Sequence, residues 1–170
     1  MHAEVLDRRN VDMIPIIIGS LLIALGAKIK IPLGFTPVPV TCQTIAVLTL
    51  GVSLGSKRGA IAAFCYLLEG AMGLPVFANG GGISYLLGPT GGYLLTYPLE
   101  AFLFGLLLEK GHKFFATLFP CLLQLAIGSI WMIPFVGIHQ VLAQGFHPFF
   151  LIEISKAIFV IGGSFLCKSK

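Results

Sequence analysis

The sequence predicts an all-α integral membrane protein with six transmembrane helices and both termini in the cytoplasm. Of its 170 residues, 56% are hydrophobic and only 11% are charged, and the mean hydropathy is +0.96. Ordinary soluble domains carry about 25% charged residues. Apolar runs bounded by charge, glycine or proline recur along the whole chain, so we expect a single membrane domain over residues 1–170.

The apolar runs give the expected helices, because an upright helix needs about 20 residues to cross a bilayer. They cover residues 12–28, 38–54, 58–76, 91–108, 114–134 and 148–167. Residues 1–11 precede the first run and are expected to form a short cytoplasmic segment. The second run begins among Pro37 and Pro39 and therefore cannot be regular helix throughout. A five-helix alternative would merge the second and third runs, but a charged turn at residues 55–59 separates them.

Basic residues set the expected orientation. An even number of crossings places both termini on one side, and the positive-inside rule makes that side cytoplasmic. The cytoplasmic side then carries Arg8, Arg9, Lys57, Arg58, Lys110, Lys113, Lys168 and Lys170. The outer side carries only Lys28 and Lys30. Because these residues are scattered and form no basic patch, the net charge of +4 predicts no nucleic-acid partner.

The last run contains an ionisable pair, Glu153 and Lys156, in an otherwise apolar stretch from Phe149 to Leu166. A charged side chain at this depth costs roughly 2.5 to 3.5 kcal/mol on insertion scales. At spacing i, i+3 the two side chains share one helix face and can form an ion pair. The pair indicates a small polar ligand held inside the membrane domain; the alternative is a mutually satisfied pair that joins helices.

Two loops without Asp, Glu, Lys or Arg, residues 77–90 and 135–147, fall on the expected outer side. The first is rich in glycine, which lets backbone approach a ligand closely. Irregular backbone at membrane depth is tolerated where it is buried in protein or lines a cavity. We therefore expect loop 77–90 to form a lid or re-entrant segment over a site, with a plain outer connector as the alternative.

Three motifs carry a resemblance to a known family: Ile31 to Thr41, Gly70 to Ala78 and Leu87 to Leu94. In this order they resemble BioY, the biotin-specific S-component of energy-coupling factor (ECF) transporters, from about residue 14 to the C-terminus. The resemblance implies a six-helix, multi-pass protein of the cell membrane that captures biotin from outside, with no cofactor and no catalytic or metal site. It also implies a transmembrane coupling subunit and two ATP-binding cassette (ABC) ATPases as partners. The chain contains no Walker A phosphate loop, so ATP hydrolysis is expected to come from these partners.

The last-helix motif of that family falls on Glu153 and Lys156, although the family carries aspartate where this chain has glutamate. The ureido ring of biotin has two N–H donors and one carbonyl acceptor, and its tail ends in a carboxylate. We expect Glu153 and Asn79 at the ring, and Lys156 at either the ring or the tail. The remaining expected ligand contacts are Tyr93 and the backbone of Gly80 at the tail, the walls Phe77 and Tyr85, and the polar pair Thr41 and Gln43.

Each of these residues has a simpler interpretation. Asn79 is also typical of a turn, Tyr93 of a membrane interface, and Thr41 and Gln43 of hydrogen bonds across helices. On the first helix, Ser20 and Ala24 form a small-residue stripe, which predicts docking of the coupling subunit or, alternatively, packing within the chain.

Other functions are less well supported by the sequence. Related vitamins also fit a pocket for an amide-like head and an anionic tail. An intramembrane hydrolase would use Ser84 with His139 or His147, but it leaves Glu153 unexplained. A carrier lacks a visible duplicated half, and a channel lacks a polar stripe through its cytoplasmic half. The remaining membrane acids, Glu69 and Glu100, favour neutralised or paired carboxylates over a proton relay, because no second acid or histidine lies at matching spacing.

Overall fold

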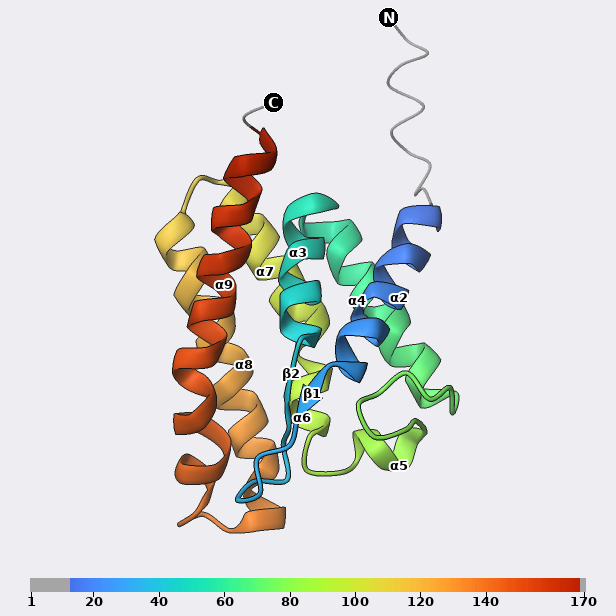
Figure 1. The fold of residues 1–170 in the computed structure, drawn as a ribbon, viewed down its shortest axis with the longest axis vertical. Helices are drawn as coiled ribbons and strands as arrows, with labels where there is room; N and C mark the ends of the chain where they lie inside the picture. Colours follow the sequence, from blue (N-terminus) through green and yellow to red (C-terminus); the bar gives the residue numbers. More distant parts are fainter. Residues whose placement is uncertain (1–12, 169–170) are drawn as a thin grey trace, which may run out of the picture.

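The computed structural model describes residues 13–168, most of which are helical. Six helices of more than ten residues lie side by side (Figure 1): α2 (Met13–Lys28), α3 (Gln43–Ser53), α4 (Gly55–Ala71), α7 (Tyr97–Glu109), α8 (Lys113–Val136) and α9 (His147–Lys168). Short elements connect them: strands β1 (Lys30–Ile31) and β2 (Val40–Thr41), helices α5 (Ile83–Leu86) and α6 (Gly91–Leu95), and the π-helical turn η1 (Leu142–Phe146). Within the described residues, two helical stretches are both long and apolar enough to cross a membrane, Lys113–Val136 and Leu142–Gly163.

The first, fifth and sixth apolar runs each form one helix with nearly the predicted bounds, as α2, α8 and α9. The second run differs, because its helix α3 begins only at Gln43. Pro37 and Pro39 exclude regular helix before that point, and the chain instead pairs Lys30 with Thr41 and Ile31 with Val40 in a two-stranded antiparallel ladder. The polar start of α3 is thereby fixed against the end of α2.

The third and fourth runs also depart from the prediction. Helix α4 ends at Ala71 rather than near residue 76, because Gly73 takes a positive φ of +97° and Pro75 follows. The fourth run is divided into α6 and α7 at Thr96, and Pro98 lies in the first turn of α7. Proline lacks the N–H that would continue the helix from α6, so the break coincides with it.

Glycines bring α3, α4 and α7 into close contact. A Cβ added to Gly51 would lie 2.7 Å from the carbonyl oxygen of Ala101, and one on Gly59 would lie 2.9 Å from the backbone of Gly51. A Cβ on Gly105 would lie 2.6 Å from the carbonyl oxygen of Gly51. Because no Cβ separates these backbones, the three helices pack as one unit in the centre of the molecule.

The connections fall at two ends of the molecule (Figure 1). Helix α2 begins and α9 ends at one end, where the α3–α4 and α7–α8 connections also lie. The opposite end carries the segment between β1 and β2, helix α5 and the connection from α8 to α9. Residues Arg8, Arg9 and Lys170 of the orientation argument, and the predicted N-terminal segment 1–11, lie outside the described residues.

Candidate functional site

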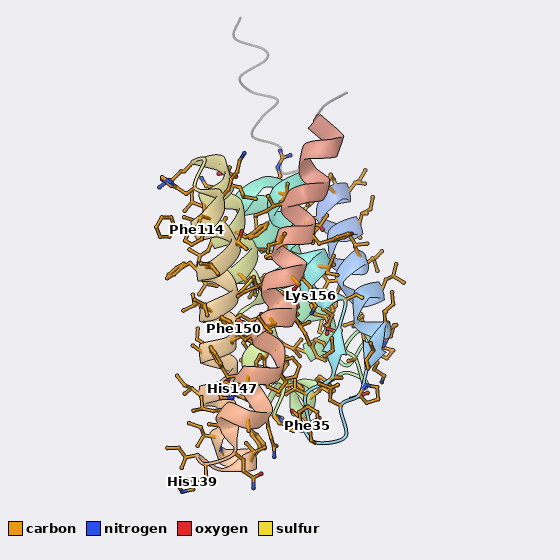
Figure 2. All side chains as sticks on the ribbon, turned by 60° about the vertical axis from the view of Figure 1, so that its left-hand side comes forward. Phe35, Phe114, His139, His147, Phe150 and Lys156 are labelled. Carbon is orange, nitrogen blue, oxygen red and sulfur yellow. The ribbon has the colours of Figure 1, made fainter. Side chains whose placement is uncertain are left out.

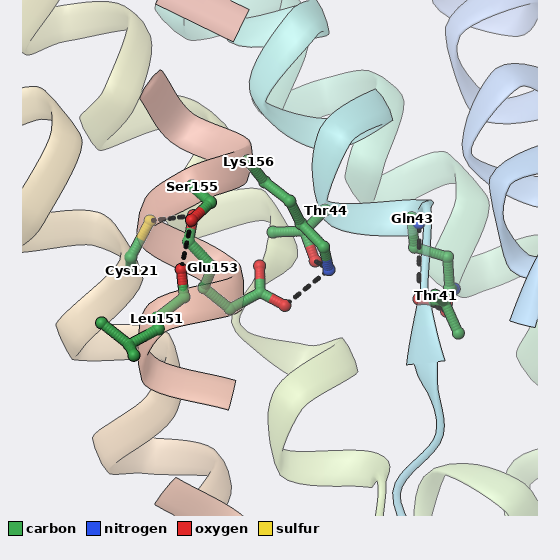
Figure 3. Close-up of polar contacts among 8 residues, drawn as sticks. All are labelled: Thr41, Gln43, Thr44, Cys121, Leu151, Glu153, Ser155 and Lys156. Atoms are coloured by element: carbon green, nitrogen blue, oxygen red, sulfur yellow. Dashed lines mark hydrogen bonds and ion pairs between the residues drawn. The ribbon is translucent and has the colours of Figure 1, made fainter. Parts of the chain in front are cut away.

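The ion pair on α9 forms as predicted and is buried. Lys156 Nζ donates to Glu153 Oε1 at 2.7 Å, and it also lies 3.4 Å from the hydroxyl oxygen of Thr44 on α3 (Figure 3). Glu153 is 6% exposed and Lys156 is 9% exposed. Spacing i, i+3 on a helix brings the two charges together, so each compensates part of the other's desolvation cost. The second carboxylate oxygen of Glu153 has no hydrogen-bond partner in the described part of the chain.

Two small cavities share part of their lining, and one of them is bordered by Glu153, whereas Lys156 lines neither. Both are lined by Val38, Pro39, Thr41, Tyr93 and Tyr97. The cavity nearer the ion pair, of about 30 Å³, is completed by Thr44, Gln124, Leu125, Phe149 and Glu153. The other, of about 40 Å³, is completed by Gln43, Ala78, Tyr85, Thr90 and Leu94. Polar groups from several helices therefore converge on one apolar-walled space, the arrangement typical of a small-molecule site.

Thr41 and Gln43 line these cavities but are bound to each other. The Thr41 hydroxyl donates to Gln43 Oε1 at 3.0 Å, and Gln43 Nε2 donates to the Tyr66 hydroxyl at 2.6 Å. The amide of Gln43 is thus held from both sides within the chain. This arrangement corresponds to the cross-helix alternative, while Thr41 and Gln43 also form part of the cavity wall.

Tyr93 lines both cavities with its ring, but its hydroxyl points to the connection between α8 and α9. It donates to the carbonyl oxygen of Gly145 at 2.8 Å and lies 3.4 Å from the Ser129 hydroxyl. The ring also packs against Gly128, where an added Cβ would lie 2.2 Å from a ring carbon. Tyr93 therefore offers a ring face to the cavities, while its hydroxyl fixes α6 to η1.

The structure places Asn79 and Gly80 away from the cavity walls. Asn79 is exposed, and its side-chain oxygen accepts a hydrogen bond from Lys30. Gly80 has a φ of +141° and pairs with Phe77 in a tight turn, which explains why glycine occupies this position. From loop 77–90, Ala78, Tyr85 and Thr90 line the cavity of about 40 Å³ near Gln43.

Phe77 is fully buried and supports the wall from behind. Its ring stacks on Tyr85 with centroids 5.1 Å apart and meets Tyr66 edge-on at 5.5 Å. It also fills the space beside Gly70, where an added Cβ would lie 2.0 Å from the ring. Tyr85 is the member of this aromatic group that lines a cavity, so Phe77 orients it.

The small-residue stripe of α2 faces the chain itself. Ser20 is fully buried, and its hydroxyl donates to Glu69 on α4 at 2.7 Å. Ala24 is half-buried and packs against the same core. These are the intramolecular contacts that the sequence left open as the alternative. Glu69, one of the two additional membrane acids, is accounted for by this hydrogen bond.

Sequence reasoning missed three residues of the site, Thr44, Tyr97 and Gln124, all of which line the cavity beside Glu153. Gln124 lies in the otherwise apolar centre of α8, and a polar side chain in such a position is the signal that would have found it. Glu100 on α7, which sequence reasoning did single out, is 1% exposed and has no hydrogen-bond partner in the described residues. It is not among the residues that line either cavity.

The hydrolase arrangement is not assembled. Ser84 is exposed on α5, whereas His139 lies in the α8–α9 connection and His147 begins α9, on the other side of the same end of the molecule (Figures 1 and 2). Across residues 13–168, Ser84 makes no hydrogen bond to a histidine. The same part of the chain contains no group of three or more His, Cys, Asp or Glu side chains that could hold a metal ion.

A helical bundle with a buried ion pair, and with a small apolar-walled cavity that Glu153 and other polar side chains border, is typical of a membrane protein that binds a small solute within its helices. The family model described as the BioY family matches residues 2–167, and the chain belongs to this family. "Probable biotin transporter BioY" of Pyrococcus horikoshii is 38% identical over 80% of this chain and 83% of its own length. "Biotin transporter BioY" of Thermotoga maritima is 42% identical over 83% of this chain and 86% of its own length.

A solved structure agrees with the fold over nearly the whole chain. The crystal structure of the S-component for biotin from an ECF-type ABC transporter superposes with a TM-score of 0.82 at 26% sequence identity. The match covers 93% of this chain and 90% of the other. The family is therefore the one expected from the three sequence motifs, and the mostly helical fold is similar to that of a biotin S-component.

Proposed function

We propose that this chain is the substrate-capture subunit of an ECF-type vitamin uptake transporter and binds biotin from the outer face. A transmembrane coupling subunit and two ABC ATPases would drive its release into the cytoplasm. The observation that carries the proposal is the buried Glu153–Lys156 ion pair at a cavity in the bundle, in a chain of the BioY family.

The chemistry of the cavity suits the head of biotin. The free oxygen of Glu153 is an acceptor for an N–H of the ureido ring, and Lys156 supplies donors to a carbonyl or carboxylate oxygen. The rings of Tyr85, Tyr93 and Tyr97 and the side chain of Phe149 supply apolar surface for the thiophane ring and methylenes.

Ligand entry requires the site to open, because drug-sized ligands occupy about 300–1,000 Å³ and the two cavities measure about 40 and 30 Å³. Val38 and Pro39 line both cavities and belong to the segment between β1 and β2 (residues 32–39). This segment, which we call the roof, contains exposed Phe35 at the end of the molecule opposite the ends of α2 and α9 (Figure 2). We expect it to move when biotin enters.

The proposed topology is multi-pass with six crossings and cytoplasmic termini in the cell membrane. The two long apolar helices and the shared end of the α2 start and α9 finish support it. That same end carries four basic residues, which agrees with the positive-inside rule: Lys57 and Arg58 near the start of α4, Lys110 directly after α7, and Lys113 at the start of α8. For the coupling subunit, the exposed face of α2 that carries Ile17, Leu21 and Leu25 is available beside the buried Ser20.

The decisive experiment is equilibrium binding of radiolabelled biotin to the purified, detergent-solubilised chain, with unlabelled biotin, thiamine and riboflavin as competitors. Saturable binding that only biotin displaces is the expected result. Displacement by thiamine or riboflavin would assign the site to another vitamin. No saturable binding by a monodisperse, cooperatively unfolding sample would reject the proposal.

A further inference from the structure

The fully buried side-chain polar atoms that lack a hydrogen-bond partner in the described residues are all oxygens. In the described residues, buried side-chain oxygens without a partner belong to Glu153, Gln124 and Glu100. Glu153 and Gln124 are 6% and 3% exposed and line the same cavity. Glu100 lines neither cavity, so the unpaired acceptors that a ligand in this cavity can reach are Glu153 Oε2 and Gln124 Oε1.

The two cavity glutamines differ in how their amides are held. Gln43 accepts from Thr41 and donates to Tyr66, so its hydrogen-bonding capacity serves the chain. Gln124 makes no side-chain hydrogen bond within residues 13–168, although it is almost fully buried in the middle of α8. A buried amide without hydrogen-bond partners destabilises the folded protein. If this position served only for packing, leucine or methionine would stabilise the protein more.

We propose that Gln124 is a ligand-recognition residue, and that its amide oxygen and the free oxygen of Glu153 accept the two N–H groups of a cyclic urea. This inference rests on the proposed function, because it assigns a role within the same site. One acceptor comes from α8 and the other from α9, so the ligand connects two helices that meet through Cys121 and the backbone of Glu153. Lys156 lines neither cavity, and its ammonium is held by Glu153 Oε1 at 2.7 Å and lies 3.4 Å from the Thr44 hydroxyl oxygen.

This arrangement gives selectivity for a head with two N–H donors. A ligand that lacks one donor leaves one of the two buried acceptors unpaired, and that penalty is the usual source of strong discrimination by polar sites. The two N–H groups of a cyclic urea point away from each other, and one oxygen of Glu153 is bound to Lys156, so Glu153 Oε2 is matched with only one of the two donors. Gln124 supplies the second acceptor that the ureido ring needs.

The test is a cycle of protein and ligand changes, read by competition against radiolabelled biotin. The ligands are biotin and its two derivatives methylated on one ureido nitrogen. The proteins are the unmodified chain, Gln124→Met, which removes the amide at similar volume, and Gln124→Ala, which leaves space for the added methyl group. Gln140→Met is the matched control, because Gln140 is exposed and its side-chain oxygen accepts from Gln144 outside the site.

We expect Gln124→Met to bind biotin about tenfold more weakly and Gln140→Met to bind it like the unmodified chain. Methylation of one nitrogen should cost affinity in the unmodified chain and cost at least tenfold less in Gln124→Ala, while methylation of the other nitrogen costs both proteins equally. Unchanged biotin affinity in Gln124→Met, or equal losses for both derivatives in Gln124→Ala, would overturn the role of Gln124. An unmodified chain that binds no biotin would instead reject the proposed function itself.

Discussion

At the scale of single residues, the site depends on how Glu153 and Lys156 share their hydrogen bonds. An isolated charge in the apolar bundle would be expensive, and the 2.7 Å contact offsets part of that cost for both side chains. The contact uses only one carboxylate oxygen, so the other keeps its capacity to accept. The ion pair thus lowers the cost of burying both charges and still leaves one carboxylate oxygen free to accept a hydrogen bond from a ligand.

Replacement of Lys156 or Glu153 by alanine is expected to weaken biotin binding at least tenfold, about 1.4 kcal/mol. Each change removes a ligand contact and leaves the other charge buried without its partner. The double variant Glu153→Gln with Lys156→Met removes both charges, so it should melt at a higher temperature than either alanine variant and still bind poorly. Competition binding and thermal unfolding in detergent separate these effects, with Lys110→Ala as the exposed control. Unchanged affinity in both alanine variants would contradict the site.

The carboxyl group of Glu100 is expected to contribute nothing to the stability of the folded protein. Both of its carboxylate oxygens lack partners in the described residues, and Lys156 is already bound to Glu153. A carboxylate in such a place has a desolvation cost that no hydrogen bond returns. Glu100→Gln keeps the shape and removes the potential charge, so its melting temperature should be equal to or higher than that of the unmodified chain. A clear drop in melting temperature would show that the acid has a partner.

The residues also show what sequence could and could not predict. The Glu153–Lys156 pair followed from helical spacing, which is a local property. The partners of Asn79 and Ser20 did not, because Lys30 and Glu69 lie 49 residues away from them and meet only through the fold. The polar position of Gln124 in the apolar centre of α8 is visible in the sequence, but whether its amide is free or is satisfied like that of Gln43 depends on the fold.

At the scale of elements, the central helices depend on glycine. Gly51→Ala is expected to destabilise the protein by about 1–3 kcal/mol, because its Cβ would lie 2.7 Å from the carbonyl oxygen of Ala101 and force α3 and α7 apart. Gly163→Ala is the matched control, because Gly163 is an exposed residue of α9 and nothing lies within 4 Å of its added Cβ. Thermal unfolding compares the two variants. Equal melting temperatures of the two variants would show that the close approach of α3 and α7 at Gly51 does not contribute to stability.

The roof provides a second prediction for an element. Val38 of the roof and Phe149 of α9 belong to one buried cluster and line the same cavity. In a background without the native cysteines, Val38→Cys with Phe149→Cys can be joined by a short bifunctional methanethiosulfonate reagent that reduction removes. The cross-linked protein should bind biotin far more slowly than the same sample after reduction. Equal association rates before and after reduction would mean that biotin enters by another route.

Helix boundaries were predictable where the chain is uniformly apolar. Where proline or strand pairing interrupts a run, the sequence indicated irregular backbone in the second run but not the residue at which the helix begins. Helices α2, α8 and α9 match their apolar runs. The start of α3 and the break between α6 and α7 depend on strand pairing and on proline, which hydropathy does not register. These irregular segments position the polar start of α3 and the ring of Tyr93, both of which line the cavities. Hydropathy therefore predicted the helix boundaries least well beside the cavities.

At the scale of the whole molecule, the orientation predicted from charge agrees with the way in which the fold groups the connections at two ends. The positive-inside rule uses only the distribution of lysine and arginine between connections. The fold places the α3–α4 and α7–α8 connections at one end and the roof with the α8–α9 connection at the other. Under the proposed topology, the positive-inside rule puts the roof on the outer face, where a captured solute would enter.

This orientation predicts which single cysteines a membrane-impermeant maleimide will label in intact cells. In a background where Cys42, Cys65, Cys121 and Cys167 are replaced by alanine, His139→Cys should be labelled without permeabilisation, because His139 is exposed on the α8–α9 connection. Lys57→Cys, in the first turn of α4 at the other end, should be labelled only after the membrane is opened. The comparison uses one reagent, one expression level and two positions on opposite ends of the same fold. Labelling of Lys57→Cys but not His139→Cys in intact cells would invert the topology and place the roof, and with it the entrance to the biotin site, in the cytoplasm.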